Sequence, residues 1–147
     1  MNDNKLMNRA ADNIRILAAS MVEKANSGHP GGAMGGADFV NVLFSEFLVF
    51  DPKNPKWEGR DRFFLDPGHM SPMLYSVLAS TGKYNMNELS QFRQWGSPTP
   101  GHPEVDVMRG VENTSGPLGQ GHTFAVGAAI AAKFLKARLG DQMSQTI

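Results

Sequence analysis

Apolar residues recur at steps of three and four positions over residues 6–25 of the chain. Because an α-helix has 3.6 residues per turn, this spacing gathers them on one face of a helix. The pattern predicts a long first helix that ends at the turn-forming residues 26–32, Asn-Ser-Gly-His-Pro-Gly-Gly. Its predicted apolar face consists of Leu6, Ala10, Ile14, Leu17, Met21 and Ala25.

Four more helices are predicted farther along the chain. The third helix has Ser71 as its N-cap and Pro72 at its first helical position, and it ends near Gly82. A short helix covers about residues 87–95. An alanine-rich helix covers about residues 119–139, and we expect it to pack closely against a sheet or another helix. The second helix carries on one side Phe39, Val40, Leu43, Phe44, Phe47 and Leu48.

Three stretches lack the helical spacing. Residues 62–66, Arg-Phe-Phe-Leu-Asp, are short and apolar and predict a buried strand that ends at a proline and a glycine. Residues 51–62 predict a surface loop, and residues 97–112 predict a long loop of the kind that is often functional. Residues 145–147 have the pattern of a strand's first residues, so we expect the chain to be a fragment of a longer domain.

Composition excludes several classes of function. The 147 residues carry no net charge, which argues against a nucleic-acid or anionic-membrane partner. No apolar run reaches the roughly 18 residues of a membrane span. The chain has no cysteine, so disulfides, a thiolate nucleophile and cysteine metal sites are excluded, and a reducing cytoplasm is the expected location.

Each of the four histidines follows a glycine, at residues 28–29, 68–69, 101–102 and 121–122. Glycine lets the backbone approach a ligand closely, and histidine changes its charge near neutral pH. The pairs predict a site in which several imidazoles surround one bound molecule. His122 begins a predicted helix, and the simpler expectation for it is a bond to solvent or to a backbone group. No two histidines have the spacing of a zinc-ligand pair, so no metal site is predicted.

The glycine-rich residues 115–121, Ser-Gly-Pro-Leu-Gly-Gln-Gly, stand directly before a predicted helix. Exposed N–H groups at a helix N-terminus suit a phosphate or diphosphate group, and a plain helix-entry turn is the alternative. His69 follows the predicted strand, where ligands bind in open α/β sheets, and a turn histidine bonded to a carbonyl is the alternative. His29 and His102 each stand between glycine and proline, which preorganises the ring to polarise a carbonyl or to shuttle a proton. Either of these two loops alone is also compatible with a surface turn, but their joint occurrence favours function.

Four motifs, in this order and spacing, resemble the transketolase family. They are Ala-Asn-Ser-Gly-His-Pro-Gly (25–31), Gly-His (68–69), Thr-Pro-Gly-His-Pro-Glu (99–104) and Thr-Ser-Gly-Pro-Leu-Gly-Gln-Gly (114–121). The resemblance spans nearly the whole chain. It implies an α/β, thiamine diphosphate-binding fold, partial here and helix-rich with few parallel strands. Residues 1–147 would be the N-terminal segment of the diphosphate-binding domain, incomplete at its C-terminus.

The resemblance also implies roles for individual residues. His29 would lie against the sugar substrate, His69 between cofactor and substrate, and His102 against the two-carbon unit held on the cofactor. The family reaction moves a two-carbon ketol unit between sugar phosphates, with thiamine diphosphate as the electron sink. The catalytic residues implied are His29, His69 and His102, and the cofactor-binding residues implied are His69, Gly116, Pro117 and Leu118.

This sequence departs from the family at several points. Residues 66–70, Asp-Pro-Gly-His-Met, replace a smaller run, and His122 occupies a position that is usually apolar, so no family role transfers to it. The family's Gly-Asp-Gly motif and later asparagine, which bind Mg²⁺, have no match here. The glutamate that activates the cofactor across a subunit interface has none either. We therefore expect the Mg²⁺ ligands outside this chain, a homodimer for the full-length enzyme, and no activity from this chain alone.

Two other interpretations stay open. A deoxyxylulose-phosphate-synthase-like enzyme of the same cofactor class shares the Gly-His loops, although residues 99–104 argue against it. The other is a non-catalytic binding or docking module that kept the fold. The sequence predicts sugar phosphates as substrates and neither a nucleic acid nor a membrane as partner.

Overall fold

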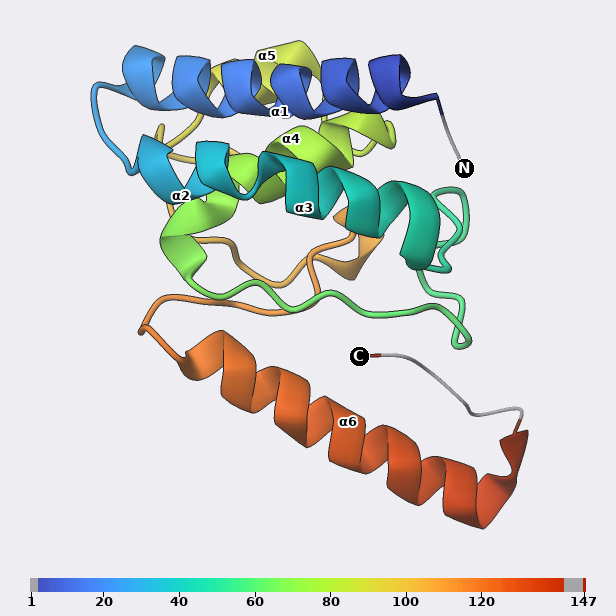
Figure 1. Cartoon of the computed structure of the whole chain (residues 1–147). Helices are drawn as coiled ribbons and strands as arrows, with labels where there is room; N and C mark the ends of the chain where they lie inside the picture. The colour runs from blue at the N-terminus through green and yellow to red at the C-terminus, as the bar shows by residue number, and fades with distance from the viewer. Residues whose placement is uncertain (1–2, 142–146) are drawn as a thin grey trace.

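The computed structural model describes residues 3–141 and residue 147 (Figure 1). Helices dominate this part of the chain, and they confirm most of the expected helical segments. The α-helices are α1 (Asn4–Ala25), α2 (Pro30–Gly35), α3 (Ala37–Val42), α4 (Ser71–Ser80), α5 (Met86–Ser90) and α6 (Gln120–Leu139). Three short turns of other helix types are η1 (Leu43–Phe47, a π-helix), η2 (Gly68–Met70) and η3 (Val107–Arg109).

The first helix is the one that the apolar spacing predicts. The Asp3 side chain caps its start by accepting a hydrogen bond from the N–H of Lys5 (3.0 Å), and Asn26 ends it in the left-handed conformation, with φ at 46°. Ile14 and Met21 of the predicted face are buried, whereas Leu6 is 58% exposed. The buried stripe therefore begins one turn later than expected.

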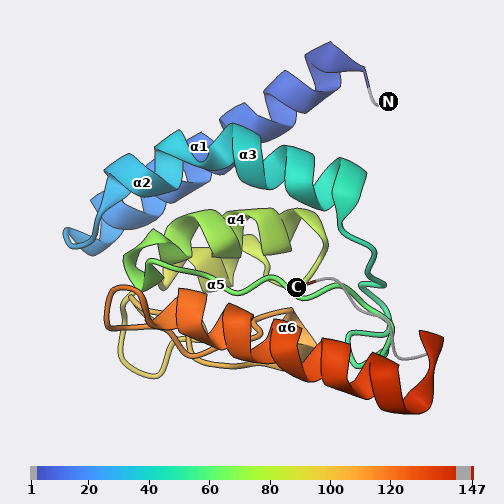
Figure 2. The same cartoon turned by 60° about the horizontal axis from the view of Figure 1, so that its bottom comes forward.

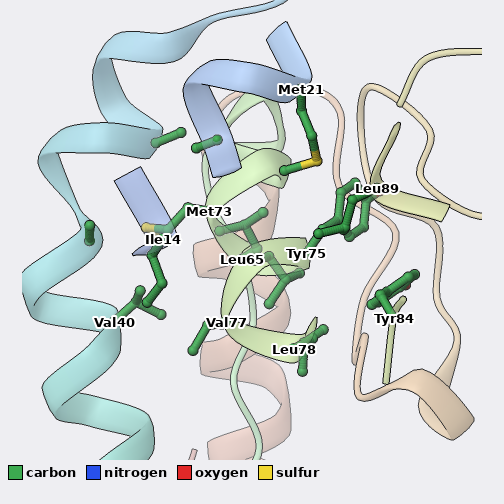
Figure 3. Close-up of a cluster of buried hydrophobic side chains, with 14 of the residues drawn as sticks. Ile14, Met21, Val40, Leu65, Met73, Tyr75, Val77, Leu78, Tyr84 and Leu89 are labelled. Carbon is green, nitrogen blue, oxygen red and sulfur yellow. The ribbon is translucent and has the colours of Figure 1, made fainter. Parts of the chain in front are cut away.

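α4 lies at the centre of the molecule. It packs against α1, α2, α3 and α5, and its first eight residues, 71–78, are all buried (Figures 1 and 2). The core around it draws side chains from α1, α3 and α5 as well as from the segments between helices (Figure 3). The labelled members are Ile14, Met21, Val40, Leu65, Met73, Tyr75, Val77, Leu78, Tyr84 and Leu89.

The second predicted helix is broken into α2, α3 and η1, and its apolar side is not a single buried face. Val40 is fully buried, but Phe39 and Phe47 are 65% and 69% exposed. The break falls at Gly36, where a Cβ atom would lie 2.6 Å from the sulfur of Met73. The backbone thus comes very close to α4 at this glycine. The side of the segment that faces α4 is the side that α4 buries.

The helix boundaries near α4 and α5 differ in detail from the sequence expectation. Met70 is the N-cap and Ser71 is the first helical residue, and the Ser71 hydroxyl donates to the carbonyl of Gly101 (2.7 Å). Pro72 lies in the first turn as expected. α5 is shorter than predicted: Asn85 begins it with a capping box to Glu88, and it ends at Ser90.

The strand predicted over residues 62–66 is extended backbone without a strand ladder. One side chain pairs with both backbone groups of Leu65 instead: the N–H of Leu65 donates to Asn113 Oδ1 (3.0 Å), and Asn113 Nδ2 donates to the Leu65 carbonyl (3.2 Å). Within residues 3–141, the only β-bridge is the isolated pair Asp106 and Val111. The strand start expected at residues 145–147 falls largely outside the described residues.

α6 runs over the predicted residues and ends at Gly140, but it lacks the expected close packing. Gly121 is its only buried residue, and the helix lies along one side of the molecule (Figure 2). Its exposed large apolar side chains are Phe124, Val126, Ile130, Phe134, Leu135 and Leu139. None of the helices in the described part of the chain is both long enough and apolar enough to cross a membrane.

Candidate functional site

Three of the four imidazoles lie together. His29 is the N-cap residue of α2, and His69 lies in the η2 turn that leads into α4. Their ring centroids are 4.7 Å apart, with an angle of 46° between the ring planes. His102 joins them from the long loop, since a Cβ atom on Gly68 would lie 2.9 Å from its Cδ2 atom. The structure thus brings together the three histidines that the motifs predict to be catalytic.

Gly68 makes this close assembly possible. A Cβ atom at this position would lie 2.5 Å from the carbonyl oxygen of Ser115, in addition to its contact with His102. Side chains never approach backbone atoms that closely, so only glycine fits without a shift of its neighbours. Gly68 is therefore the point at which the His69 turn, the His102 loop and the glycine-rich loop meet.

Hydrogen bonds to its backbone carbonyl groups fix the position of the loop that carries His102. Four of them accept a hydrogen bond, and the donors come from three different segments. The bonds are Arg93 N–H to Thr99 (3.0 Å), Tyr75 hydroxyl to Pro100 (2.8 Å), Ser71 hydroxyl to Gly101 (2.7 Å) and Ser115 N–H to Pro103 (3.1 Å). Burial raises the pKa of Tyr75 far above its ordinary value, so its hydroxyl stays protonated and remains a donor.

Arg93 lies beside the histidine cluster, although the sequence predicts a helix at this position. It has a φ of 62°, and its Nη1 donates to the hydroxyl of Ser27 (2.8 Å) beside His29. It also lies against the backbone of the His102 loop, since a Cβ atom on Gly101 would be 2.6 Å from its Nε. Arg93, Ser27 and His102 line one open hollow of the surface. No local sequence pattern marks Arg93, because its contacts depend on the turn after α5.

The pKa of His102 is lowered. Partial burial of the imidazole is the largest cause, and electrostatic interactions with Arg93, His69 and His29 add to it. The neutral ring is therefore favoured near neutral pH, although His102 is among the exposed residues. A neutral imidazole can both donate and accept a hydrogen bond, which is what proton transfer to and from a hydroxyl needs.

The glycine-rich loop offers open backbone next to this cluster. Its first residue, Ser115, is 1% exposed, and its buried hydroxyl has no hydrogen-bond partner among the described residues. Gly116 has no atom within 4 Å of where a Cβ would lie, and Leu118 is 74% exposed. Pro117 is exposed as well. The loop then enters the N-terminus of α6, so a free hydroxyl, open glycine backbone and a helix N-terminus adjoin one another.

His122 does not join the cluster, and its side chain is 78% exposed to solvent, but its partner within the molecule is a side chain and not the expected backbone group. Its Nδ1 atom pairs with the carboxylate of Asp66, whose side chain is only 5% exposed. Within residues 3–141 and residue 147, no group of three or more histidine, aspartate or glutamate side chains is arranged to hold a metal ion.

A model of the protein family described as "Transketolase, thiamine diphosphate binding domain" matches residues 6–147. The chain belongs to the transketolase family. Transketolase 1 of Escherichia coli (strain K12) is 54% identical over 129 residues, covering 87% of this chain and 20% of that protein. "Transketolase-1, chloroplastic" of Arabidopsis thaliana is 46% identical over 147 residues, covering 99% of this chain and 20% of that protein.

Solved transketolase structures share the fold. Transketolase from Campylobacter jejuni superposes with a TM-score of 0.88 at 47% identity, covering 96% of this chain and 22% of that one. Transketolase from Leishmania mexicana gives a TM-score of 0.86 at 46% identity, covering 90% of this chain and 20% of that one. The chain spans about a fifth of the length of these relatives.

These likenesses confirm the family and the fold class. The helix-rich chain is part of the α/β, thiamine diphosphate-binding fold of transketolase, and the alternative of a deoxyxylulose-phosphate-synthase-like enzyme is not favoured. The roles of His29, His69 and His102, and those of residues 116–118, stay predictions.

Proposed function

We propose that this chain supplies the N-terminal part of a transketolase that moves a two-carbon ketol unit between sugar phosphates. The observation that carries the proposal is the meeting of His29, His69 and His102 beside the first residue of the glycine-rich loop. These side chains come from three separate loops, and each loop has contacts that fix its position.

The glycine-rich loop fits the diphosphate group of the cofactor. We propose that the backbone of Gly116 and Pro117 and the side chain of Leu118 line the cofactor, with the N-terminus of α6 facing the diphosphate. The buried, unpartnered hydroxyl of Ser115 supports this assignment, because such a group ordinarily has a partner. When bound, thiamine diphosphate supplies an electron sink for the carbon that carries the transferred unit.

The three imidazoles then have separate tasks. His69 follows Gly68, which touches Ser115, so we place it between cofactor and substrate. We propose that His29, whose ring centroid lies 4.7 Å from that of His69, holds a substrate hydroxyl or carbonyl and assists its proton transfer. His102, neutral near pH 7, is suited to hydrogen-bond the two-carbon unit. The fixed loops limit how far these rings move during the reaction.

We propose that other segments of the enzyme complete the active site. We propose Mg²⁺ as the metal that anchors the diphosphate, with ligands outside the chain, and a homodimer as the full assembly. Sugar phosphates of pentose phosphate metabolism are the proposed substrates, and sugar-phosphate transfer by this chain alone is expected to be absent. The cytoplasm is the proposed location, with the lack of cysteine as its support. Relatives with chloroplastic names occur as well as bacterial ones.

Cofactor titration followed by nuclear magnetic resonance tests the proposal. Thiamine diphosphate, added with Mg²⁺ to the isotope-labelled chain, should shift the amide signals of Gly116 and Leu118 and the ring signals of His69. Thiamine without phosphate is the control ligand and should leave the loop amides unchanged. Shifts confined to other parts of the chain, or none at millimolar cofactor, would contradict the site. Robust ketol transfer by the 147-residue chain alone would contradict the proposed division of the active site.

A further inference from the structure

The carboxylate of Asp66 holds two groups from the start of α6. One oxygen accepts a hydrogen bond from the backbone N–H of Gly119 (3.3 Å), and the other pairs with Nδ1 of His122. A carboxylate only accepts, so this ring nitrogen carries a proton. The Asp66 side chain is 5% exposed, whereas that of His122 is 78% exposed. The carboxylate is thus buried and its partner is at the surface. Removal of the imidazole would leave the buried carboxylate without this partner, which is unfavourable.

This contact lies where α6 joins the rest of the molecule. Gly121 is the only buried residue of α6, and a Cβ atom there would lie 2.4 Å from both the Leu65 carbonyl oxygen and the Asp66 Cβ. The residues on either side of Gly121 supply the polar contacts to Asp66. Within the described residues, the start of α6 is thus seated on Leu65 and Asp66.

The glycine-rich loop is consequently held at both ends by one short segment. At its first residue, the Ser115 carbonyl presses against Gly68, and at its far end Gly119 and His122 bind Asp66. Between these two points, residues 116–118 face open space. Asp66 and His122 also stand where this sequence departs from the transketolase motifs, so the family pattern assigns neither of them a role.

We propose that Asp66 and His122 are positioning residues that set the glycine-rich loop at a fixed distance from His69. The pair acts through the backbone of residues 115–119 and touches no reacting atom. Without the pair, the loop keeps its contact with Gly68 at Ser115 but loses its polar contacts with Asp66 at the other end. α6 and the loop can then turn about Gly121. That the loop carries thiamine diphosphate rests on the proposed function; the positioning itself does not.

Amide hydrogen exchange in the 147-residue chain tests the positioning. Asp66→Asn and His122→Ala should each speed the exchange of the Gly119 and Gly121 amides about tenfold, because a charge-assisted hydrogen bond is lost. The double variant should be no faster than Asp66→Asn, since both substitutions remove the same contact. His122→Gln keeps an amide donor and should restore exchange to within about twofold of the original chain.

The control is Asp38→Asn, which removes another aspartate that pairs with a cation, here Arg15 of α1. It should leave Gly119 and Gly121 unchanged. Equal acceleration of amides in α1 and α4 would assign the pair to general stability and overturn the proposal, as would unchanged exchange or purely additive effects in the double variant. If Asp66→Asn does not fold, the two variants of the exposed His122 still decide the question. Exchange is measured without cofactor, so the thiamine diphosphate titration tests the proposed function separately.

Discussion

At the scale of single residues, Gly68 carries the tightest requirement in the site. Gly68→Ala would put a methyl group 2.5 Å from the Ser115 carbonyl oxygen and 2.9 Å from the His102 ring. The neighbours must shift to relieve this overlap, so we expect the free energy of unfolding to fall by about 1–3 kcal/mol. Gly116→Ala is the matched control, because no atom lies within 4 Å of its Cβ position, and its effect should stay below about 1 kcal/mol. Urea unfolding measures both, and equal losses would contradict the crowding at Gly68.

The pKa of His102 should depend on the neighbouring Arg93. The positive charge of Arg93 helps to lower the pKa of His102, so Arg93→Gln should raise it toward the ordinary value of about 6.5. Because the native ring binds its proton less tightly than the unfolded one, His102 makes the native state less stable as pH falls through about 6.5. The loss levels off below the lowered native pKa, and Arg93→Gln should make it smaller.

Ring-proton signals followed against pH measure the shift directly. Arg138→Gln, which removes an arginine near the far end of α6, is the control and should leave the titration of His102 in place. A titration of His102 that does not move in Arg93→Gln would show that the charge of Arg93 does not reach the ring.

The sequence predicted the histidine cluster but not its surroundings. His29, His69 and His102 stand in local motifs that combine glycine, proline and histidine. These motifs are visible in the sequence, so the three residues could be predicted from it. Arg93 pairs with a serine 66 positions away, and His122 pairs with a carboxylate 56 positions away. Such pairs depend on how helices and loops fold back on one another, and no local pattern records them.

At the scale of elements, the two long helices were the most predictable. The course of α1 and its end follow from apolar spacing and the turn-forming residues 26–32, and the extent of α6 follows from its alanine-rich sequence and from Gly140. The strand over residues 62–66 was not correctly predicted, since a strand needs a neighbouring backbone and Asn113 takes that place here. The break at Gly36 was also missed, because its cause is the sulfur of Met73 on another helix.

A hydrogen bond from α4 helps to fix the position of the His102 loop. Tyr75→Phe removes the hydroxyl that donates to the Pro100 carbonyl (2.8 Å), in a side chain that is 1% exposed. The Pro100 carbonyl is only partly buried, so loss of its donor should lower the free energy of unfolding by about 0.5–1.5 kcal/mol, the usual net value of one hydrogen bond. Tyr84→Phe is the control, a buried tyrosine whose hydroxyl has no hydrogen-bond partner among the described residues, and whose ring remains under the guanidinium of Arg109. Chemical denaturation compares them, and a larger loss in Tyr84→Phe would contradict the assignment.

At the scale of the whole molecule, two isoleucines on different helices should behave in opposite ways. Ile14 on α1 is 1% exposed in the core, and Ile14→Ala should lower the free energy of unfolding by about 2–5 kcal/mol. Ile130 on α6 is 64% exposed, and Ile130→Ala should change it by less than about 0.5 kcal/mol. A large loss in Ile130→Ala would mean that α6 is covered in solution, and a concentration-dependent mass would then identify a second copy as the cover.

Local stability should follow the same division. Helices in proteins owe most of their stability to packing of one face, and α6 buries only Gly121. The amides of α6 should therefore exchange with solvent faster than those of α1 and α4, through local opening that leaves the core intact. Hydrogen exchange read residue by residue measures this, and equal protection in α6 and α4 would contradict it.

The four occupied carbonyls of the loop around His102 have a consequence for ligand affinity. A loop that has already given up its conformational freedom on folding loses little more when a molecule binds. The hydroxyls of Ser71 and Tyr75 lie outside this loop, but their hydrogen bonds order it before any ligand binds. They thereby reduce the entropy that is lost when a ligand contacts His102. A substitution in the buried face of α4 should then weaken binding through lost preorganisation, with every direct contact to the ligand left in place.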